Sequence, residues 1–191
     1  MIIADPDLSG DLKISTQDFD LSPLCSDDAE DILREFSDPE ITRWMDIDPL
    51  RTLDEAVSII TWAESQRALG AGVRWTIRRR EDHVFAGTCG FNNIVLERGR
   101  RGEIAYDLDR RWQRRGVMAQ VLPAVIGFGW DRLGLHRQEA MVTPGNDRSC
   151  ALLERHGFAR EGVLSGYGFW KGRFWDQIVY GLTRCEAIAT L

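Results

Sequence analysis

An arginine-rich turn carries the clearest chemical signal in the sequence. Residues 106–122 run from an apolar stretch through a basic turn with one glycine into a second apolar stretch. A turn that opens a helix presents backbone N–H groups at the positive end of the helix dipole, and phosphate groups bind there. The basic residues of this turn are Arg110, Arg111, Arg114 and Arg115, and the glycine is Gly116. The pattern predicts an anion site, and the alternative is a solvated turn without a ligand.

The composition limits the classes of function. The chain has 191 residues, a net charge of −6 and 43% hydrophobic residues, which is typical of one folded domain. A general nucleic-acid binder normally has a basic domain, so we expect no nucleic-acid partner. The sequence contains no run of 18 apolar residues and no signal-peptide pattern, so we expect a cytoplasmic protein without a membrane partner. Its four cysteines and three histidines lack the spacing of metal ligands, which predicts free thiols and no metal.

Hydrophobic spacing and turn residues predict the elements that position the basic turn. Strands are predicted at residues 12–21, 73–79, 84–95, 103–109, 137–142, 163–170 and 174–182. Helices are predicted at residues 26–36, from 39, and at 53–69, 115–133 and 147–156, the third of them starting at a capping box of Thr52 and Glu55. Helices that cross over a mixed central sheet of about seven strands indicate an α/β (α+β) fold. We expect residues 1–10 to form a loose tail and residues 11–191 to form a single domain.

Four motifs in order along the chain resemble the GNAT acetyltransferases, in particular their RimJ/RimL branch. Residues 113–118 are similar to the acetyl-CoA loop of that family, Q/R-x-x-G-x-G/A, with Met118 in place of the last small residue. Residues 143–162 resemble the pattern N-x-x-S-x-x-L-x-x-x-G-F-x-x-E-G. Residues 172–177 resemble the G-x-W-x-D turn, and residues 86–90 resemble a third-strand motif. The resemblance covers roughly residues 73–183.

This resemblance implies a single GNAT domain that binds acetyl-CoA as its cosubstrate. It implies transfer of the acetyl group to a primary amine by direct attack in a ternary complex. The residues that the resemblance assigns to acetyl-CoA are Asp107, Leu108, Asp109, Arg114, Arg115, Gly116, Val117, Met118, Ala119, Asn146 and Ser149. The first three would bind through their backbones, with a β-bulge freeing an N–H group.

The resemblance also assigns the proton-transfer groups. Glu103 lies 13 residues before Gly116, where several GNAT enzymes carry a glutamate that acts as base, often through water. The alternative is an edge-strand glutamate that faces solvent. Many members place a tyrosine acid at the position of Leu153, so Ser149 becomes the predicted replacement. Some RimL-type enzymes carry a further glutamate where this chain has Gly168, which favours Glu103 as the base.

The acceptor is predicted to be an amine that is cationic before it reacts. Trp44, Asp46 and Asp48 lie in the segment that usually flanks the acceptor site in the family, and we place Trp170 there too. A protein N-terminus is the favoured acceptor. The alternatives are a small-molecule amine such as an antibiotic, an aminoacyl nucleotide or a polyamine, or a non-catalytic CoA-responsive binding module. We expect a monomer or a homodimer.

Overall fold

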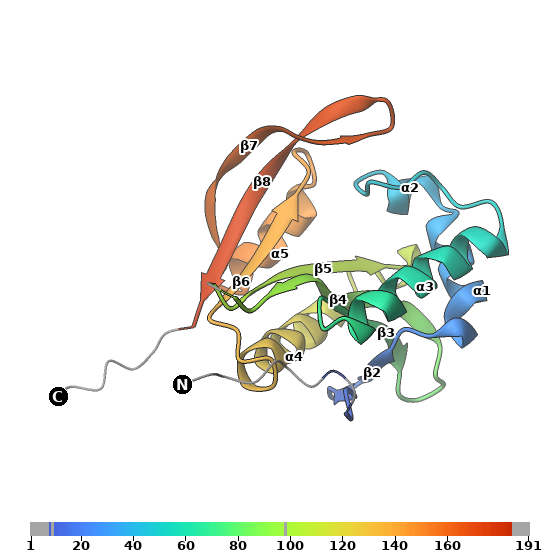
Figure 1. Ribbon diagram of the computed structural model, residues 1–191. Coiled ribbons are helices and arrows are strands. Elements are labelled where there is room, and N and C mark those ends of the chain that lie inside the picture. The colour runs from blue at the N-terminus through green and yellow to red at the C-terminus, as the bar shows by residue number, and fades with distance from the viewer. Residues whose placement is uncertain (1–7, 9, 98, 185–191) are drawn as a thin grey trace.

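One mixed sheet of eight strands organises the molecule (Figure 1). The structure, a computed structural model, describes residues 8, 10–97 and 99–184. The strands are β1 (Ile14–Ser15), β2 (Phe19–Pro23), β3 (Val73–Arg79), β4 (Phe85–Val95), β5 (Arg101–Leu108), β6 (Arg137–Val142), β7 (Ala159–Trp170) and β8 (Arg173–Thr183). They lie side by side in the order β1-β2-β3-β4-β5-β6-β8-β7, and every neighbouring pair is antiparallel except β5 with β6.

Helices cover both faces of this sheet (Figure 1). They are η1 (Ser26–Asp28), α1 (Ala29–Phe36), α2 (Pro39–Thr42), α3 (Leu53–Ala68), η2 (Arg110–Trp112), α4 (Val117–Asp131) and α5 (Asp147–Arg155). Helices α1 and α3 pack together on one face, and α4 packs against β1, β2 and β4. The predicted capping box starts α3: the N–H of Glu55 donates to Thr52 Oγ1 at 3.3 Å, and the N–H of Thr52 donates to Glu55 Oε2 at 3.0 Å.

The structure corrects two predicted boundaries. The first predicted strand, residues 12–21, is a tight hairpin of β1 and β2, which is why eight strands replace about seven. Helix α4 begins at Val117, because the preceding Gly116 has φ +76° and cannot continue a right-handed helix. Most of the predicted tail, residues 1–10, falls outside the described residues, but Leu8 is buried in the core.

Cys25, Cys89 and Cys150 are free thiols, and Cys185 lies outside the described residues.

The important feature of the sheet is the separation of β5 from β6. These strands are parallel partners only from Arg101 to Glu103, opposite Arg137 to Glu139. Strand β5 then continues to Leu108 while it remains paired with β4. The two strands therefore diverge after Glu103, and the last five residues of β5 have no β6 partner.

Candidate active site

A cavity of about 1700 Å³ opens where β5 and β6 diverge. Its walls come from β5, from the N-terminal ends of α4 and α5, from the segment between α2 and α3, and from β7. Segments that are far apart in the sequence thus meet around one space. A cavity at the open end of a sheet, lined by apolar surface with a few polar groups, is the usual form of a small-ligand site.

The free edge of β5 faces this cavity with its backbone. The N–H of Asp109 donates to Ala86 O in β4 at 3.0 Å, so odd-numbered residues of this strand direct their backbone groups to β4. By the same alternation, Tyr106 and Leu108 direct theirs to the gap left by β6. The N–H of Asp109 is thus used within the sheet, and Asp107 lies on the same side of the alternation, so of the three residues predicted to bind the cofactor through their backbones only Leu108 faces the gap. The β4–β5 register is also regular at Leu108, so the predicted bulge is absent there and lies in β4 instead.

The basic turn has the conformation of an anion-binding loop. Gly116 caps α4 with φ +76°, and a Cβ atom added there would meet no atom within 4 Å. The space beside the helix N-terminus is therefore open to a ligand. Gln113 holds the turn in place, because its Nε2 donates to Leu108 O at 3.3 Å and its Oε1 accepts from Arg148 at 3.1 Å. The side chain of Arg115 turns away toward the ring of Trp112.

Glu103 stands at the point where the two strands part. Its side chain lines the cavity and is partly buried. Burial raises the pKa of the Glu103 carboxyl, and the negative charges of Glu139 and Asp46 raise it further. A carboxylate with a raised pKa is a stronger base than an ordinary one, which suits the removal of a proton from an amine.

A second pair of side chains meets on the other side of the opening. The hydroxyl of Tyr106, from β5, lies 2.7 Å from Ser149 Oγ, in the first turn of α5. Asn146 caps this helix through a 3.3 Å bond from the N–H of Ser149 to its Oδ1, which is the local role that the N-x-x-S motif permits. Burial raises the pKa of the Tyr106 phenol, so this hydroxyl stays protonated and can donate to Ser149.

The side chain of Asp107 is held by partners within the sheet. It forms an ion pair with Arg74, and it accepts from the N–H of Thr88 at 3.0 Å and from Thr88 Oγ1 at 2.8 Å. This arrangement leaves Glu103 as the better placed carboxylate in the cavity.

Aromatic side chains from two segments surround the far end of the cavity. Trp44 lies against Gly145, where an added Cβ atom would be 3.1 Å from its ring. The ring of Trp170 covers Gly168, where an added Cβ atom would be 2.1 Å away, and it stacks on Trp175 at 5.7 Å. The indole of Trp170 therefore fills the space next to position 168.

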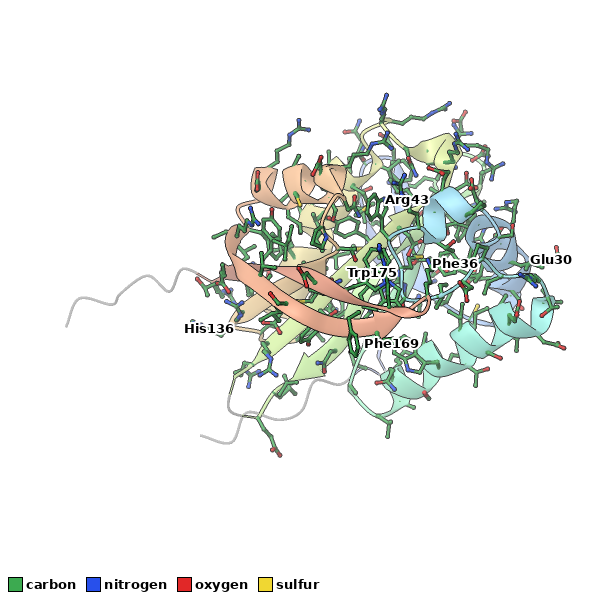
Figure 2. All side chains as sticks on the ribbon, turned by 90° about the horizontal axis from the view of Figure 1, so that it is seen from above. Glu30, Phe36, Arg43, His136, Phe169 and Trp175 are labelled. Atoms are coloured by element: carbon green, nitrogen blue, oxygen red, sulfur yellow. The ribbon has the colours of Figure 1, made fainter. Side chains whose placement is uncertain are left out.

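The tip of the β7–β8 hairpin reaches α2 across this end. Lys171 Nζ donates to Thr42 O at 2.6 Å. Figure 2, which looks at the molecule from above, labels Phe169 and Trp175 on the hairpin and Arg43 beside α2. The hairpin and α2 thus form opposite sides of one opening.

Most of the predicted site residues line the cavity. These are Trp44, Asp46, Glu103, Asp107, Leu108, Arg114, Gly116, Val117, Met118, Ala119, Asn146, Ser149 and Trp170. Asp48, Asp109 and Arg115 are not among its lining residues, and Asp48 is exposed to solvent. The sequence reasoning missed Arg74, Asn92 and Tyr106, which also line it. Tyr106 was within the motif already quoted, but only the fold shows that it meets Ser149.

Comparison with known proteins identifies the family. The model of the acetyltransferase (GNAT) domain matches residues 19–159. The chain belongs to the GNAT acetyltransferase family. It is therefore an acyltransferase whose cosubstrate is acetyl-CoA, and the predicted fold is confirmed.

In the described part of the chain, no group of three or more His, Cys, Asp or Glu residues could hold a metal ion. None of the helices described has the length and apolar character needed to cross a membrane.

Individual relatives support the assignment of the chain to this family. The chain is 33% identical over 164 residues to an uncharacterised N-acetyltransferase, YoaA, of Bacillus subtilis (strain 168), covering 86% of this chain and 92% of the relative. It is 32% identical over 103 residues to the ribosomal protein uS5 alanine N-acetyltransferase of Escherichia coli (strain K12), covering 54% and 53% of the two chains. Mycobacterium smegmatis RimJ in complex with CoA-disulfide has a similar fold, with a TM-score of 0.82 at 21% identity over 93% of this chain and 90% of that one.

Proposed function

We propose that this acetyltransferase acetylates the α-amine of a protein N-terminus in a ternary complex within the cavity between β5 and β6. The observation that carries the proposal is the position of Glu103 on the cavity wall, with its pKa raised by burial, Glu139 and Asp46. An amine reaches the enzyme as a cation and must lose a proton before it attacks, because an α-amine has a pKa near 8. Nearby carboxylates attract the cation, and Glu103 accepts its proton.

The groups that line the cavity fit acetyl-CoA. The open, left-handed position at Gly116 lets the pyrophosphate approach the N–H groups at the start of α4. The backbone groups of Tyr106 and the N–H of Leu108, which have no partner in β6, suit the amides of the pantetheine arm. When bound, acetyl-CoA supplies a thioester whose acetyl carbon the uncharged amine attacks, with loss of a proton from nitrogen and departure of the CoA thiolate.

The residues of the chain then have separate tasks. Glu103 takes the proton from the amine nitrogen, directly or through a water molecule. Asp46 draws the amine toward Glu103. Ser149 Oγ offers a hydrogen bond to the departing sulfur, and little protonation is needed because a thiol has a pKa near 8.5.

A small-molecule amine is the second candidate acceptor. The bond from Lys171 to Thr42 O ties the hairpin tip to α2 and bridges the acceptor end of the cavity. Such a bridge narrows the access for a folded protein but admits an extended N-terminus or a small amine.

The test is a panel of acceptors incubated with acetyl-CoA, followed by measurement of CoA release and acceptor mass. The panel holds peptides with free α-amines, the same peptides with blocked α-amines, polyamines and aminoacyl nucleotides. We expect the highest kcat/KM with free α-amino peptides. A higher kcat/KM with a polyamine or an aminoacyl nucleotide would replace the proposed acceptor, and acetyl-CoA binding without any transfer would indicate a binding module.

A further inference from the structure

A buried row of polar side chains leads from α1 to the cavity. It begins at Glu35, which is 2% exposed and whose carboxyl oxygens meet no donor among the described residues. Its neighbour is the carboxyl group of Asp107, and burial together with the charge of Asp107 raises the pKa of Glu35 well above its ordinary value. Both effects favour the protonated form of Glu35, which can donate a hydrogen bond to the Asp107 carboxylate.

Arg74 is the next member of the row. It forms an ion pair with Asp107, and its Nε donates to Thr88 Oγ1 at 2.8 Å. One positive charge, one negative charge and one neutral acid make the group neutral overall. Buried charges are tolerated when they are paired in this way and their donors are used, so the guanidinium of Arg74 is held in a fixed position.

Arg74 in turn fixes the orientation of Asn92. Its Nη1 donates to Asn92 Oδ1 at 3.0 Å. A guanidinium group has donors only, so the amide of Asn92 must present its oxygen to Arg74. The NH2 group of Asn92 lies on the other branch of the amide, and Asn92 lines the cavity. The amide donors of Asn92 are thus left for a partner within the cavity.

A β-bulge brings this amide to the level of Glu103. Phe91 pairs with Ile104 and Asn93 pairs with Glu103, so Asn92 is the additional residue in β4. The side chain of Asn92 lies on the same face of the sheet as those of Arg74 and Asp107. Glu103 lies four residues before Asp107 in β5, so its side chain is on that face too. Bulges re-aim side chains in this way, often beside active sites. A fixed donor and the proposed base therefore lie on neighbouring strands and line the same cavity.

We propose that the amide of Asn92 donates a hydrogen bond to the carbonyl oxygen of the acceptor, so that the site selects amines with a carbonyl on the adjacent carbon. This inference rests on the proposed function and narrows it to α-aminoacyl acceptors. In a peptide N-terminus, one carbon separates the amine nitrogen from the carbonyl group. The amine nitrogen would then face the base, Glu103, and the carbonyl oxygen would face the donor, Asn92. An alkylamine leaves the amide donor without a partner, and an unpaired donor in a closed site is costly.

The experiment compares two acceptors that differ in one group. The first is a peptide accepted by the wild type, and the second is the same peptide with its first carbonyl replaced by a methylene. The methylene changes the basicity of the amine, but it does so equally for every enzyme variant. The quantity measured is therefore the ratio of the two kcat/KM values for the wild type divided by the same ratio for the Asn92→Asp variant.

Asn92→Asp keeps the shape of the side chain and an oxygen for Arg74, but it removes the amide donors. We expect the preference for the carbonyl acceptor to fall by roughly 5- to 100-fold in this variant. Asn93→Asp is the matched control, because Asn93 is exposed and is not a lining residue of the cavity. It adds the same charge one residue away and should keep the wild-type preference. Glu35→Gln retains an N–H donor for Asp107, so this variant should also keep the wild-type preference for the carbonyl acceptor.

Three results would count against the inference. An equal preference in the wild type and in both Asn92→Asp and Asn92→Ala, with acetyl-CoA affinity retained, would overturn it while leaving the proposed function intact. A wild type that prefers the methylene acceptor after correction for basicity would do the same. Acetylation of neither acceptor by the wild type would overturn the proposed function and this inference together.

Discussion

At the level of single residues, Glu103 is the group on which the proposed chemistry depends. Glu103→Gln keeps the size of the side chain and removes its capacity to accept a proton. We expect kcat to fall by roughly 10²- to 10⁴-fold, with acetyl-CoA affinity nearly unchanged. Steady-state kinetics between pH 6 and 9 and calorimetry measure the two quantities. A loss of less than about threefold would mean that another group, or bulk water, takes the proton.

Asp46 should shift the pH at which Glu103 becomes active. The charge of Asp46 contributes to the raised pKa of Glu103, so Asp46→Asn should lower that pKa. Glu103 would then lose its proton at a lower pH, and the acidic limb of the kcat/KM profile should move to lower pH. The acceptor KM should rise, since one attracting charge is lost. Asp48→Asn is the matched control, because Asp48 is exposed and outside the cavity lining; an equal shift in both variants would point to a general charge effect.

Tyr106 and Ser149 should act as one unit because their hydroxyl oxygens are 2.7 Å apart. We expect Tyr106→Phe to lower kcat by roughly 3- to 10-fold, the value of one hydrogen bond. In the Ser149→Ala background the same change should have almost no effect. A double-mutant cycle on kcat reports this coupling. Additive losses would show that the phenol of Tyr106 serves packing and not Ser149.

Single residues differ in how well the sequence predicts them. Gly116, Asn146 and Ser149 could be placed because their roles depend on local spacing at the start of a helix. Arg74, Asn92 and Tyr106 could not, because their contacts join separate elements and one depends on a β-bulge that leaves no periodic pattern. Asp48 was misplaced for a related reason. The segment between α2 and α3 is irregular, so its residue spacing does not tell which side chains face inward.

At the level of elements, the turn before α4 should decide acetyl-CoA binding. Gly116→Glu adds a negative charge in the space beside the helix N-terminus and forces a side chain onto a left-handed backbone, which costs about 1–2 kcal/mol. We expect acetyl-CoA affinity to fall by roughly 100-fold or more, as measured by calorimetry. Gly127→Glu, in the same helix with open space around it, is the control. Unchanged affinity in a folded Gly116→Glu protein would place the phosphates elsewhere.

The β7–β8 hairpin should affect the acceptor and not the cofactor. Gly168→Ala places a methyl group where the Trp170 ring lies, so the indole must move. We expect a higher acceptor KM with unchanged acetyl-CoA affinity. Gly162→Ala, in the same strand and free of close contacts, should behave as the wild type. An unchanged acceptor KM in the Gly168→Ala variant would exclude Trp170 from the acceptor site.

The order of the elements was largely predictable, but the divergence of two of them was not. Capping residues and hydrophobic spacing located α3 and α5, and glycines located the turns. The separation of β5 from β6 after Glu103 depends on tertiary packing, because nothing in the strand sequence of β5 distinguishes its paired from its unpaired half. The hairpin of β1 and β2 was read as one strand since its turn is only a few residues long.

At the level of the whole molecule, one cavity connects the turn before α4, the free edge of β5, the proposed base Glu103 and the aromatic side chains of Trp44 and Trp170. The most direct test of this arrangement is to locate the acetyl group that the wild type transfers. The acceptor is a peptide library with three randomised N-terminal residues, one internal serine and one internal lysine, and tandem mass spectrometry finds the modified atom. We expect acetyl groups on the α-nitrogen alone, with one CoA thiol released for each. Acetylation confined to the lysine or the serine, or acetyl-CoA binding without any transfer, would contradict the account.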